Sequence, residues 1–276
     1  MNDIDSKRAV LVTGASSGLG ARTAQMLAEQ GYPVVGAARR VEQIAQLAGV
    51  VPVHLDLTDE ASIDRAVAAA QAECGPIEIL VNDAGYGEFG SFEETPLTRA
   101  RRQFDVNVFG LAALTQRLLP PMRQARRGRI VNVSSLAGEF SSPMGGWYHA
   151  SKFALEALSD SMRAELRPFG IQVTVVQPGP VRTPWHEDAL ASLQESSGHG
   201  AYTQMAEAVA AYHRTNQDKV ITSDVDQVAV SIVKAATTPH PRPRYRVGRG
   251  AAAAVAISKL PDRTFDAMIR RQFRLP

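Results

Sequence analysis

Cysteine is almost absent from the chain, since Cys74 is the only one among 276 residues. A single cysteine excludes an intrachain disulfide and fits a reducing compartment, so we expect a cytoplasmic protein. The first residues, Asn2-Asp-Ile-Asp, lack the basic start and long apolar core of a signal peptide. The longest uninterrupted apolar run near the C-terminus, Ala251–Ile257, is far shorter than the ~20 residues that cross a bilayer. We therefore predict no membrane span.

An excess of charge of one sign is missing as well. The chain has 30 basic and 28 acidic side chains, which give a formal net charge of +2. This balance argues against nucleic acid as a partner. His186, His199 and His213 lack the spacing of metal ligands, so no metal site is predicted.

Short apolar runs typical of strands alternate with helical patterns along the chain. This alternation predicts an α/β fold in which a parallel sheet is flanked by helices. Right-handed crossovers then give a doubly wound, Rossmann-like sheet of about seven strands, with ligands at the carboxyl ends of the strands. With 45% hydrophobic residues, residues 1–276 can form one domain around a single core. The strand-like runs are residues 9–13, 33–38, 51–55, 77–82, 129–134, 171–176 and 244–247.

A glycine-rich turn follows the first strand-like run, in Thr13-Gly-Ala-Ser-Ser-Gly-Leu-Gly20. Glycines let the backbone approach a pyrophosphate, and the free N–H groups at a helix start favour negative charge. The spacing Gly-x-x-x-Gly-x-Gly differs from the best-known dinucleotide fingerprint, Gly-x-Gly-x-x-Gly. We interpret the turn as a phosphate cradle; the alternative is a plain strand-to-helix turn.

Tyr148 and Lys152 are four residues apart, and Ser135 lies thirteen positions before the tyrosine. Positions i and i+4 share a helix face, so the ammonium is expected beside the phenol. A free phenol has a pKa of about 10 and carries protons poorly near neutrality, whereas a neighbouring positive charge favours the phenolate. The three residues indicate a site that reduces carbonyls.

These motifs together resemble the short-chain dehydrogenase/reductase family, and the resemblance extends through almost the whole chain. It includes Asn82-Asp-Ala-Gly85, Val106-Asn-Val-Phe-Gly110 and Gln177-Pro-Gly-Pro-Val-Arg-Thr-Pro184. One position departs from the family pattern, because Asp83 replaces the usual asparagine. We interpret Asp83 as a solvent-facing, capping or structural residue; the alternative is an effect on cofactor affinity.

The resemblance implies a role for each of four catalytic residues. Tyr148 is the general acid or base that exchanges a proton with the carbonyl oxygen. Ser135 hydrogen-bonds that oxygen, and Lys152 holds the nicotinamide ribose and lowers the pKa of the phenol. Asn107 holds a water through which protons reach the lysine.

The resemblance also implies the cofactor contacts. Asp56 touches adenine, or caps the following helix, and Thr183 bonds the nicotinamide amide. The expected contacts are Gly14, Ser16, Ser17, Gly18, Leu19, Gly20, Arg39, Asp56, Leu57, Asn82, Ala84, Gly85, Tyr148, Lys152, Pro178, Gly179, Val181 and Thr183.

The end of the second strand predicts the choice of cofactor. An acid at this point would bond the adenosine ribose of NAD, but the chain reads Gly36-Ala-Ala-Arg-Arg40. Ala38 occupies the place of the acid by analogy, and the Arg39 guanidinium suits a 2′-phosphate. NADP(H) is therefore favoured over NAD(H). The alternative is that Arg39 and Arg40 belong to a solvated helix start.

The segment from Pro184 to about Asp218 is polar and irregular, and we expect it to form the substrate lid. Gly85-Tyr-Gly-Glu-Phe-Gly90 and the segment around Phe109 look like family members that act on steroids, retinoids or other apolar carbonyls. A small apolar carbonyl or alcohol is thus the expected substrate. The resemblance further implies a homodimer or homotetramer built through the long helices near residues 99–122 and 148–167.

Two other functions remain open at this point. A dehydratase or epimerase on the same fold would need further acid and base groups near Tyr148, and the sequence identifies none. A catalytically silent NADPH-binding regulator would not need Asn107, Ser135, Tyr148 and Lys152 intact.

Overall fold

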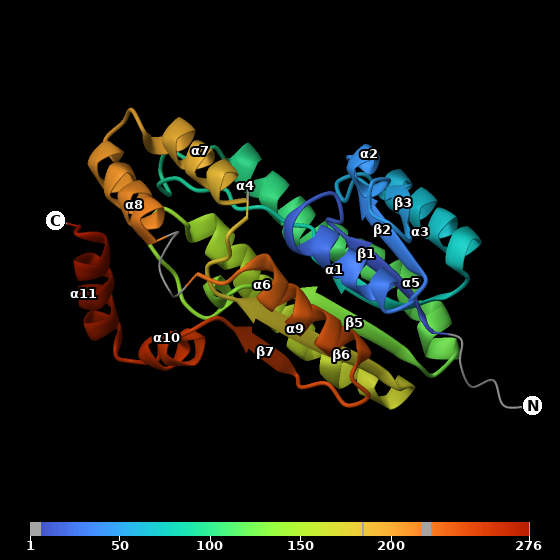
Figure 1. The fold of residues 1–276 in the computed structure, drawn as a ribbon. Coiled ribbons are helices and arrows are strands. Elements are labelled where there is room, and N and C mark those ends of the chain that lie inside the picture. The colour runs from blue at the N-terminus through green and yellow to red at the C-terminus, as the bar shows by residue number, and fades with distance from the viewer. Residues whose placement is uncertain (1–6, 184, 217–221, 276) are drawn as a thin grey trace, which may run out of the picture.

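The computed structural model describes residues 7–183, 185–216 and 222–275. Its centre is a parallel sheet with the strand order β3-β2-β1-β4-β5-β6-β7 (Figure 1). The sheet confirms the predicted doubly wound fold of seven strands. The strands are β1 (Ala9–Thr13), β2 (Val34–Ala38), β3 (Val50–His54), β4 (Ile77–Asn82), β5 (Gly128–Val133), β6 (Ile171–Pro178) and β7 (Arg244–Val247).

Side chains that alternate along the strands form two apolar cores, one on each face of the sheet. In β1, Leu11 joins one core and Val12 the other, as the two-residue period of a strand requires. Helices α3 (Glu60–Cys74) and α5 (Leu111–Gln124) cover the first core, whereas α1 (Gly18–Glu29) and α9 (Val225–Thr237) cover the second. Burial on both faces explains why the strands read as continuous apolar runs.

Helix α6 (Gly146–Leu166) lies beside β6 and carries two of the predicted catalytic residues. A π-helical turn, η1 (Asp105–Gly110), separates α4 (Leu97–Phe104) from α5. Short elements complete this part of the chain: α2 (Val41–Ile44), η2 (Leu136–Gly138) and η3 (Arg167–Phe169).

The predicted irregular lid is instead two helices, α7 (Trp185–Ser197) and α8 (Thr203–Asn216). These helices were not predicted, because polar residues separate the apolar residues that their inner faces bury. Leu193 and Val209 are buried in a third apolar cluster, which also contains Phe273 of α11 (Asp262–Phe273). The predicted lid limits at Pro184 and Asp218 lie outside the described residues, as does the expectation for residues 2–5.

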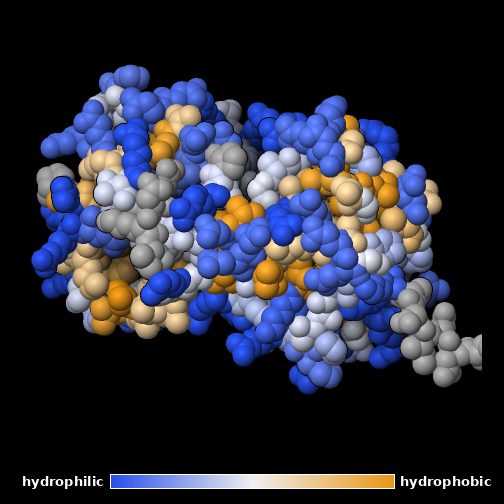
Figure 2. Space-filling view, viewed as in Figure 1, coloured by the Kyte–Doolittle hydropathy of each residue, from blue (hydrophilic) through white to orange (hydrophobic). Residues whose placement is uncertain are grey.

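Helices α7, α8 and α11 lie together at the end of the molecule that is far from the N-terminus, and α10 (Ala251–Ile257) lies below them (Figure 1). The face in Figure 2 is mostly hydrophilic, and its apolar residues form separate patches. Among the described residues, no helix is long and apolar enough to cross a membrane.

Candidate active site

The glycine turn after β1 lies at the carboxyl end of the sheet, where space is too limited for larger residues. Gly14 and Gly18 have φ of +70° and +56°, a region that L side chains rarely adopt. A Cβ on Gly20 would lie 2.5 Å from the carbonyl oxygen of Gly14. Ser17 caps α1 without a side-chain hydrogen bond, so the N–H groups of Gly18 and Leu19 at the helix start keep their capacity for an anion. The turn fits the pyrophosphate of a dinucleotide.

The segment after β4 forms the wall behind this turn. Thr13 Oγ1 accepts hydrogen bonds from the N–H groups of Asp83 (3.1 Å) and Ala84 (3.0 Å). Asn82 is buried, and its amide donates to Asn132 Oδ1 at 2.9 Å and to Thr115 Oγ1 at 3.2 Å. The amide of Asn82 therefore ties β4 to β5 and α5, while its predicted contact with the cofactor stays a prediction.

Ser135, Tyr148 and Lys152 come together at the carboxyl end of β5. Ser135 begins η2, and its hydroxyl hydrogen-bonds the buried Tyr148 phenol. Lys152 lies one turn further along α6, and its Nζ is 5.9 Å from the centroid of the Tyr148 ring. That Nζ donates to the carbonyl oxygen of Val133 at 3.0 Å. The geometry groups the three residues as predicted, while their roles stay predictions.

Burial controls the proton affinities in this cluster. It raises the pKa of Tyr148 to about 12, although the bond from Ser135 acts in the opposite direction. Burial also lowers the pKa of Lys152 to about 8, against the attraction of Asp83 and Glu156. Sequence analysis expected the lysine to lower the pKa of the phenol. In this structure burial instead raises the pKa of the phenol, and the Lys152 ammonium, 5.9 Å from the ring centroid, donates to the Val133 carbonyl.

Asn107 is held by protein groups on the π-helical turn. Its Nδ2 donates to the Tyr86 carbonyl at 2.9 Å and to Ser151 Oγ at 3.1 Å, and its Oδ1 accepts from the Tyr86 N–H at 3.1 Å. Both amide protons are therefore used, and they fix the loop at residues 85–86 to α6. The predicted water could reach this side chain only through Oδ1.

Asp83, the departure from the family pattern, faces the glycine turn. A Cβ on Gly20 would lie 2.9 Å from Asp83 Oδ2, and the Gly20 N–H donates to the carboxylate. Burial raises the pKa of Asp83 to about 7, while Lys152 and the Gly20 N–H oppose the shift. The side chain thus caps the start of α1 inside the site, which rules out the solvent-facing interpretation.

Arg39 and Asp56, which are predicted to meet the adenosine half of the cofactor, follow β2 and β3. Asp56 accepts hydrogen bonds from the N–H (2.9 Å) and Oγ1 (2.7 Å) of Thr58, and these bonds hold the turn before α3. They also lower the pKa of Asp56, with a smaller contribution from the Arg39 guanidinium. Arg39 is exposed, so its fork is accessible to a phosphate. Leu57, a predicted contact, is buried in the first core.

The chain after β6 returns over the glycine turn. Thr183 Cγ2 would lie 3.7 Å from a Cβ on Gly18, and the Gly179 N–H donates to the Val247 carbonyl at 2.9 Å. Val181 forms an isolated bridge with Ser223 just before α9. The structure therefore places the Pro178–Thr183 segment beside the cradle.

An apolar wall covers the phenol, and its Phe89 and Trp185 lie in the two segments that are predicted to meet the substrate. The Tyr148 ring lies 5.2 Å from Trp185 and 5.7 Å from Phe89. Met144 is also buried in this cluster. Trp185 belongs to the predicted lid and Phe89 to the segment of residues 85–90, whereas Met144 gave no periodic signal that would have connected it to Tyr148. The site therefore presents apolar surface to whatever meets the phenol.

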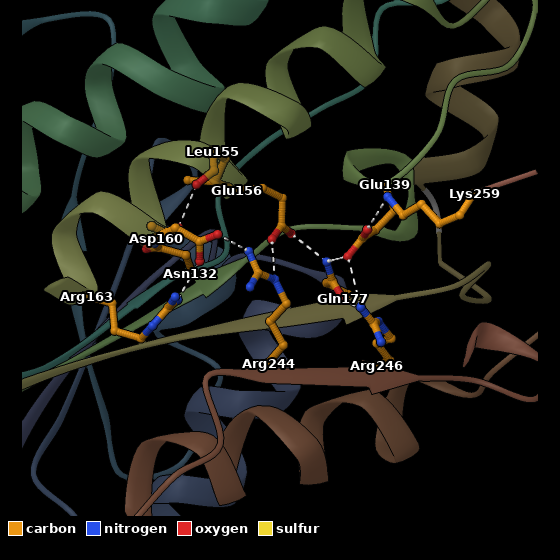
Figure 3. Close-up of polar contacts among 11 residues, drawn as sticks. Asn132, Glu139, Leu155, Glu156, Asp160, Arg163, Gln177, Arg244, Arg246 and Lys259 are labelled. Carbon is orange, nitrogen blue, oxygen red and sulfur yellow. Dashed lines mark hydrogen bonds and ion pairs between the residues drawn. The ribbon is translucent and has the colours of Figure 1, made fainter. Parts of the chain in front are cut away.

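A paired charge network, defined as Glu139, Glu156, Gln177, Arg244 and Arg246, supports the other side of α6 (Figure 3). Gln177 donates to Glu139 at 2.8 Å and to Glu156 at 3.0 Å, and Arg244 donates to Glu156 at 3.0 Å. Arg246 donates to the Gln177 oxygen at 3.2 Å. Since Glu156 follows Lys152 by one helical turn, the network fastens the active-site helix to β6 and β7.

Comparisons with known proteins agree with this site. The family model described as short chain dehydrogenase matches residues 8–194. A 3-ketodihydrosphingosine reductase from Bacteroides thetaiotaomicron is 42% identical over 174 residues, which are 63% of this chain and 64% of that protein. The chain thus matches less than two thirds of the length of that relative.

Solved structures extend the similarity to most of the chain. A short-chain dehydrogenase from Streptomyces avermitilis has a TM-score of 0.77 and 33% identity, covering 92% of each chain. An actinorhodin polyketide ketoreductase with NADPH has a TM-score of 0.75 and 25% identity, covering 89% of this chain and 97% of that one. This protein belongs to the short-chain dehydrogenase/reductase family of oxidoreductases, as the sequence motifs predicted.

Proposed function

We propose that the protein is an NADP(H)-dependent reductase of an apolar ketone or aldehyde. One observation carries the proposal: Ser135, Tyr148 and Lys152 lie between a cradle for a dinucleotide and a wall of Phe89 and Trp185. The family sets the class of reaction, while the apolar wall supports the class of substrate.

The proposed chemistry is the reduction of a carbonyl group, with a nicotinamide supplying the hydride. Tyr148 donates the proton to the carbonyl oxygen, and its pKa of about 12 keeps the phenol protonated for this task. Ser135 hydrogen-bonds the same oxygen as charge develops on it. Lys152 is within reach of the phenol ring and lowers the cost of that charge.

The preference for NADP(H) rests on Arg39. This side chain is exposed at the end of β2, where Ala38 leaves no carboxylate to repel a 2′-phosphate. A guanidinium offers two parallel hydrogen bonds to a phosphate. The NADPH in the similar ketoreductase supports the same preference.

The two alternative functions find less support. A dehydratase or epimerase needs another acid or base beside the phenol, and His149 is the nearest candidate on α6. Its ring nitrogens are used by the carbonyls of Ala137 and Phe140 and by the Ser142 hydroxyl. A silent regulator has no need of the Ser135, Tyr148 and Lys152 arrangement.

The exposed apolar residues support the proposed homodimer or homotetramer. Phe109 is 63% exposed, Phe153 46% and Leu158 40%, and they lie on η1 and α6. Apolar groups of this size on neighbouring helices favour burial against a second copy. The cytoplasm remains the proposed location because the chain has a single cysteine.

The test is the oxidation of NADPH and, separately, NADH in the presence of aliphatic ketones, aldehydes and ketosteroids. We expect substrate-dependent oxidation of NADPH that disappears in Tyr148→Phe. Tight NADPH binding with no turnover of any substrate would instead favour the silent regulator. A preference for NADH would contradict the argument from Arg39.

A further inference from the structure

Two histidines from different helices meet above the apolar wall. His186 of α7 and His213 of α8 have ring centroids 5.1 Å apart. The Nε2 atoms of both rings are buried and have no hydrogen-bond partner. The His213 backbone accepts a hydrogen bond from the His186 ring. Since His186 Nε2 is unpartnered, Nδ1 is the donor, and Nε2 carries a lone pair when the ring is neutral.

The environment keeps this histidine pair neutral at physiological pH. Burial lowers the pKa of His213 to about 4, with further contributions from the charges of His186 and His149. Burial lowers the pKa of His186 as well. His149 and Tyr212 are titratable groups beside the pair, and burial lowers the pKa of His149 as well. Two neutral rings offer hydrogen-bonding atoms without the repulsion of two adjacent charges.

The pair lines a small hollow that is otherwise apolar. The other lining residues are Phe89, Trp185, Ala189 and Leu190, none of which provides a side-chain acceptor. The hollow has a volume of about 10 Å³, so the two unpartnered nitrogens face room for one small polar group. Among the described residues, no three His, Cys, Asp or Glu side chains form a group that could hold a metal ion. A hydroxyl or ammonium group at the end of a ligand has the size and the hydrogen-bonding capacity that this hollow offers.

The hollow is separated from the phenol by single aromatic rings. Phe89 lies 6.0 Å from His213 and 5.7 Å from Tyr148, while Trp185 lies 5.2 Å from Tyr148. A molecule whose carbonyl meets Tyr148 can therefore extend along Phe89 and Trp185 toward the pair. Other buried polar atoms without partners occur in the described chain, but their residues do not line this hollow.

We propose that His186 and His213 form a polar subsite for the substrate, which binds a hydroxyl or ammonium group carried on an otherwise apolar ketone. The subsite rests on the proposed function and specifies its substrate. His186 Nε2 accepts a hydrogen bond from the donor group. An apolar ketone without a donor leaves both nitrogens unpartnered on binding, which weakens its selection.

The experiment uses 2-dodecanone and dodecanones that carry one hydroxyl or one amino group at carbon 1, 4, 6 or 8. We expect at least one derivative to exceed the plain ketone about tenfold in kcat/KM, as one hydrogen bond of ordinary strength allows. His186→Phe and His213→Phe preserve an aromatic ring and are expected to bring the kcat/KM of the derivative and of the plain ketone to the same value. His199→Phe, at an exposed histidine between the two helices, is the matched control and should keep the preference.

Equilibrium binding separates this inference from the proposed function. The dissociation constants of the same compounds for the enzyme–NADPH complex, and for the complex with NADP⁺ if NADPH is consumed, are measured by calorimetry. Tighter binding of a donor-bearing compound that disappears in both variants supports the subsite even where no ketone is reduced, an outcome that would contradict the reductase alone. Equal binding and equal kcat/KM for all the dodecanones in the wild type would overturn the subsite, as would a preference that survives both substitutions. Thermal unfolding and NADPH affinity verify that each variant is folded.

Discussion

Two polar clusters near helix α6 differ in how many of their buried groups have hydrogen-bond partners. Behind the helix, the paired charge network satisfies Glu156 with Arg244 and Gln177 (Figure 3). In front of it, Tyr148 faces an apolar wall, and the nearby histidine pair leaves two buried nitrogens without partners. Buried polar groups in proteins are usually paired, because an unpaired one costs about 1–3 kcal/mol. Paired groups hold a fold together, whereas unpaired groups beside a reactive residue are available to a ligand.

The comparison also explains why the reactive residues lie on this helix. Lys152 and Glu156 are one helical turn apart, so the network that fixes Glu156 also fixes the lysine. Glu156 counteracts the effect of burial on the pKa of Lys152. The paired charge network therefore holds Lys152 in place beside Tyr148.

The largest effect is expected from breaking the front cluster at its reactive residue. Tyr148→Phe removes the proton donor and leaves the aromatic contacts with Phe89 and Trp185. General acid catalysis contributes roughly 10²–10⁴-fold, so kcat is expected to fall by about that factor. Steady-state kinetics measure the loss, and fluorescence titration with NADPH serves as the control, with little change expected. Unchanged kcat in this variant would remove Tyr148 from the chemistry.

Breaking the paired charge network is expected to affect stability more than any substitution at the histidine pair. Glu156→Ala leaves Arg244 with Asp160 as its remaining partner and leaves a Gln177 N–H without its acceptor. Because Arg244 is 26% exposed and keeps Asp160, the expected cost is that of an unsatisfied buried hydrogen bond, about 1–3 kcal/mol in the free energy of unfolding. Urea denaturation measures this change. Arg163→Ala, at the half-exposed pair with Asp160, is the control and is expected to cost less than about 1 kcal/mol. Equal effects of the two substitutions would contradict a supporting role for the network.

Asp83 combines features of both clusters. Its charged form is favoured by Lys152 and disfavoured by burial. The folded protein holds this proton up to a pH of about 7, whereas an unfolded aspartate releases it near pH 4. Stability from this group is thus present below about pH 4 and is lost as pH rises to about 7. We expect Asp83→Asn to become the more stable form over this range, with the difference growing by about 1.4 kcal/mol for each pH unit. Denaturation of both proteins between pH 4 and pH 8 tests the sign, and parallel curves would contradict it.

Much of the fold could be predicted from the sequence because short apolar runs and glycine turns are local signals. Gly14, Gly18 and Gly20 mark a backbone conformation and a close approach that other residues cannot adopt. The order of the strands then follows from the resemblance of the motifs to a known family. These signals also brought Ser135, Tyr148 and Lys152 to one place.

The remaining features depend on contacts between residues that are distant in the sequence. His186 and His213 approach each other because α7 packs on α8. Phe89, in a loop after β4, contacts both Tyr148 and His213. Glu156 and Arg244 are 88 positions apart, so no periodic pattern links them. The pKa of Tyr148 was predicted in the wrong direction for this arrangement, because burial cannot be read from a motif.

The smallest change in stability is expected at the histidine pair. His186→Phe removes a buried nitrogen that has no partner and keeps a ring against Trp185 and His213. Replacing an unsatisfied polar group with an apolar one of similar shape is close to neutral or stabilising, so the free energy of unfolding is expected to stay the same or to rise by less than about 1 kcal/mol. Differential scanning calorimetry at pH 7 measures it. The lost bond to the His213 carbonyl acts against this gain, and His213→Phe, which keeps that carbonyl, separates the two contributions. A loss of unfolding free energy as large as that of Glu156→Ala would mean that the histidines stabilise the fold. The contrast between the paired charge network and the histidine pair would then be wrong.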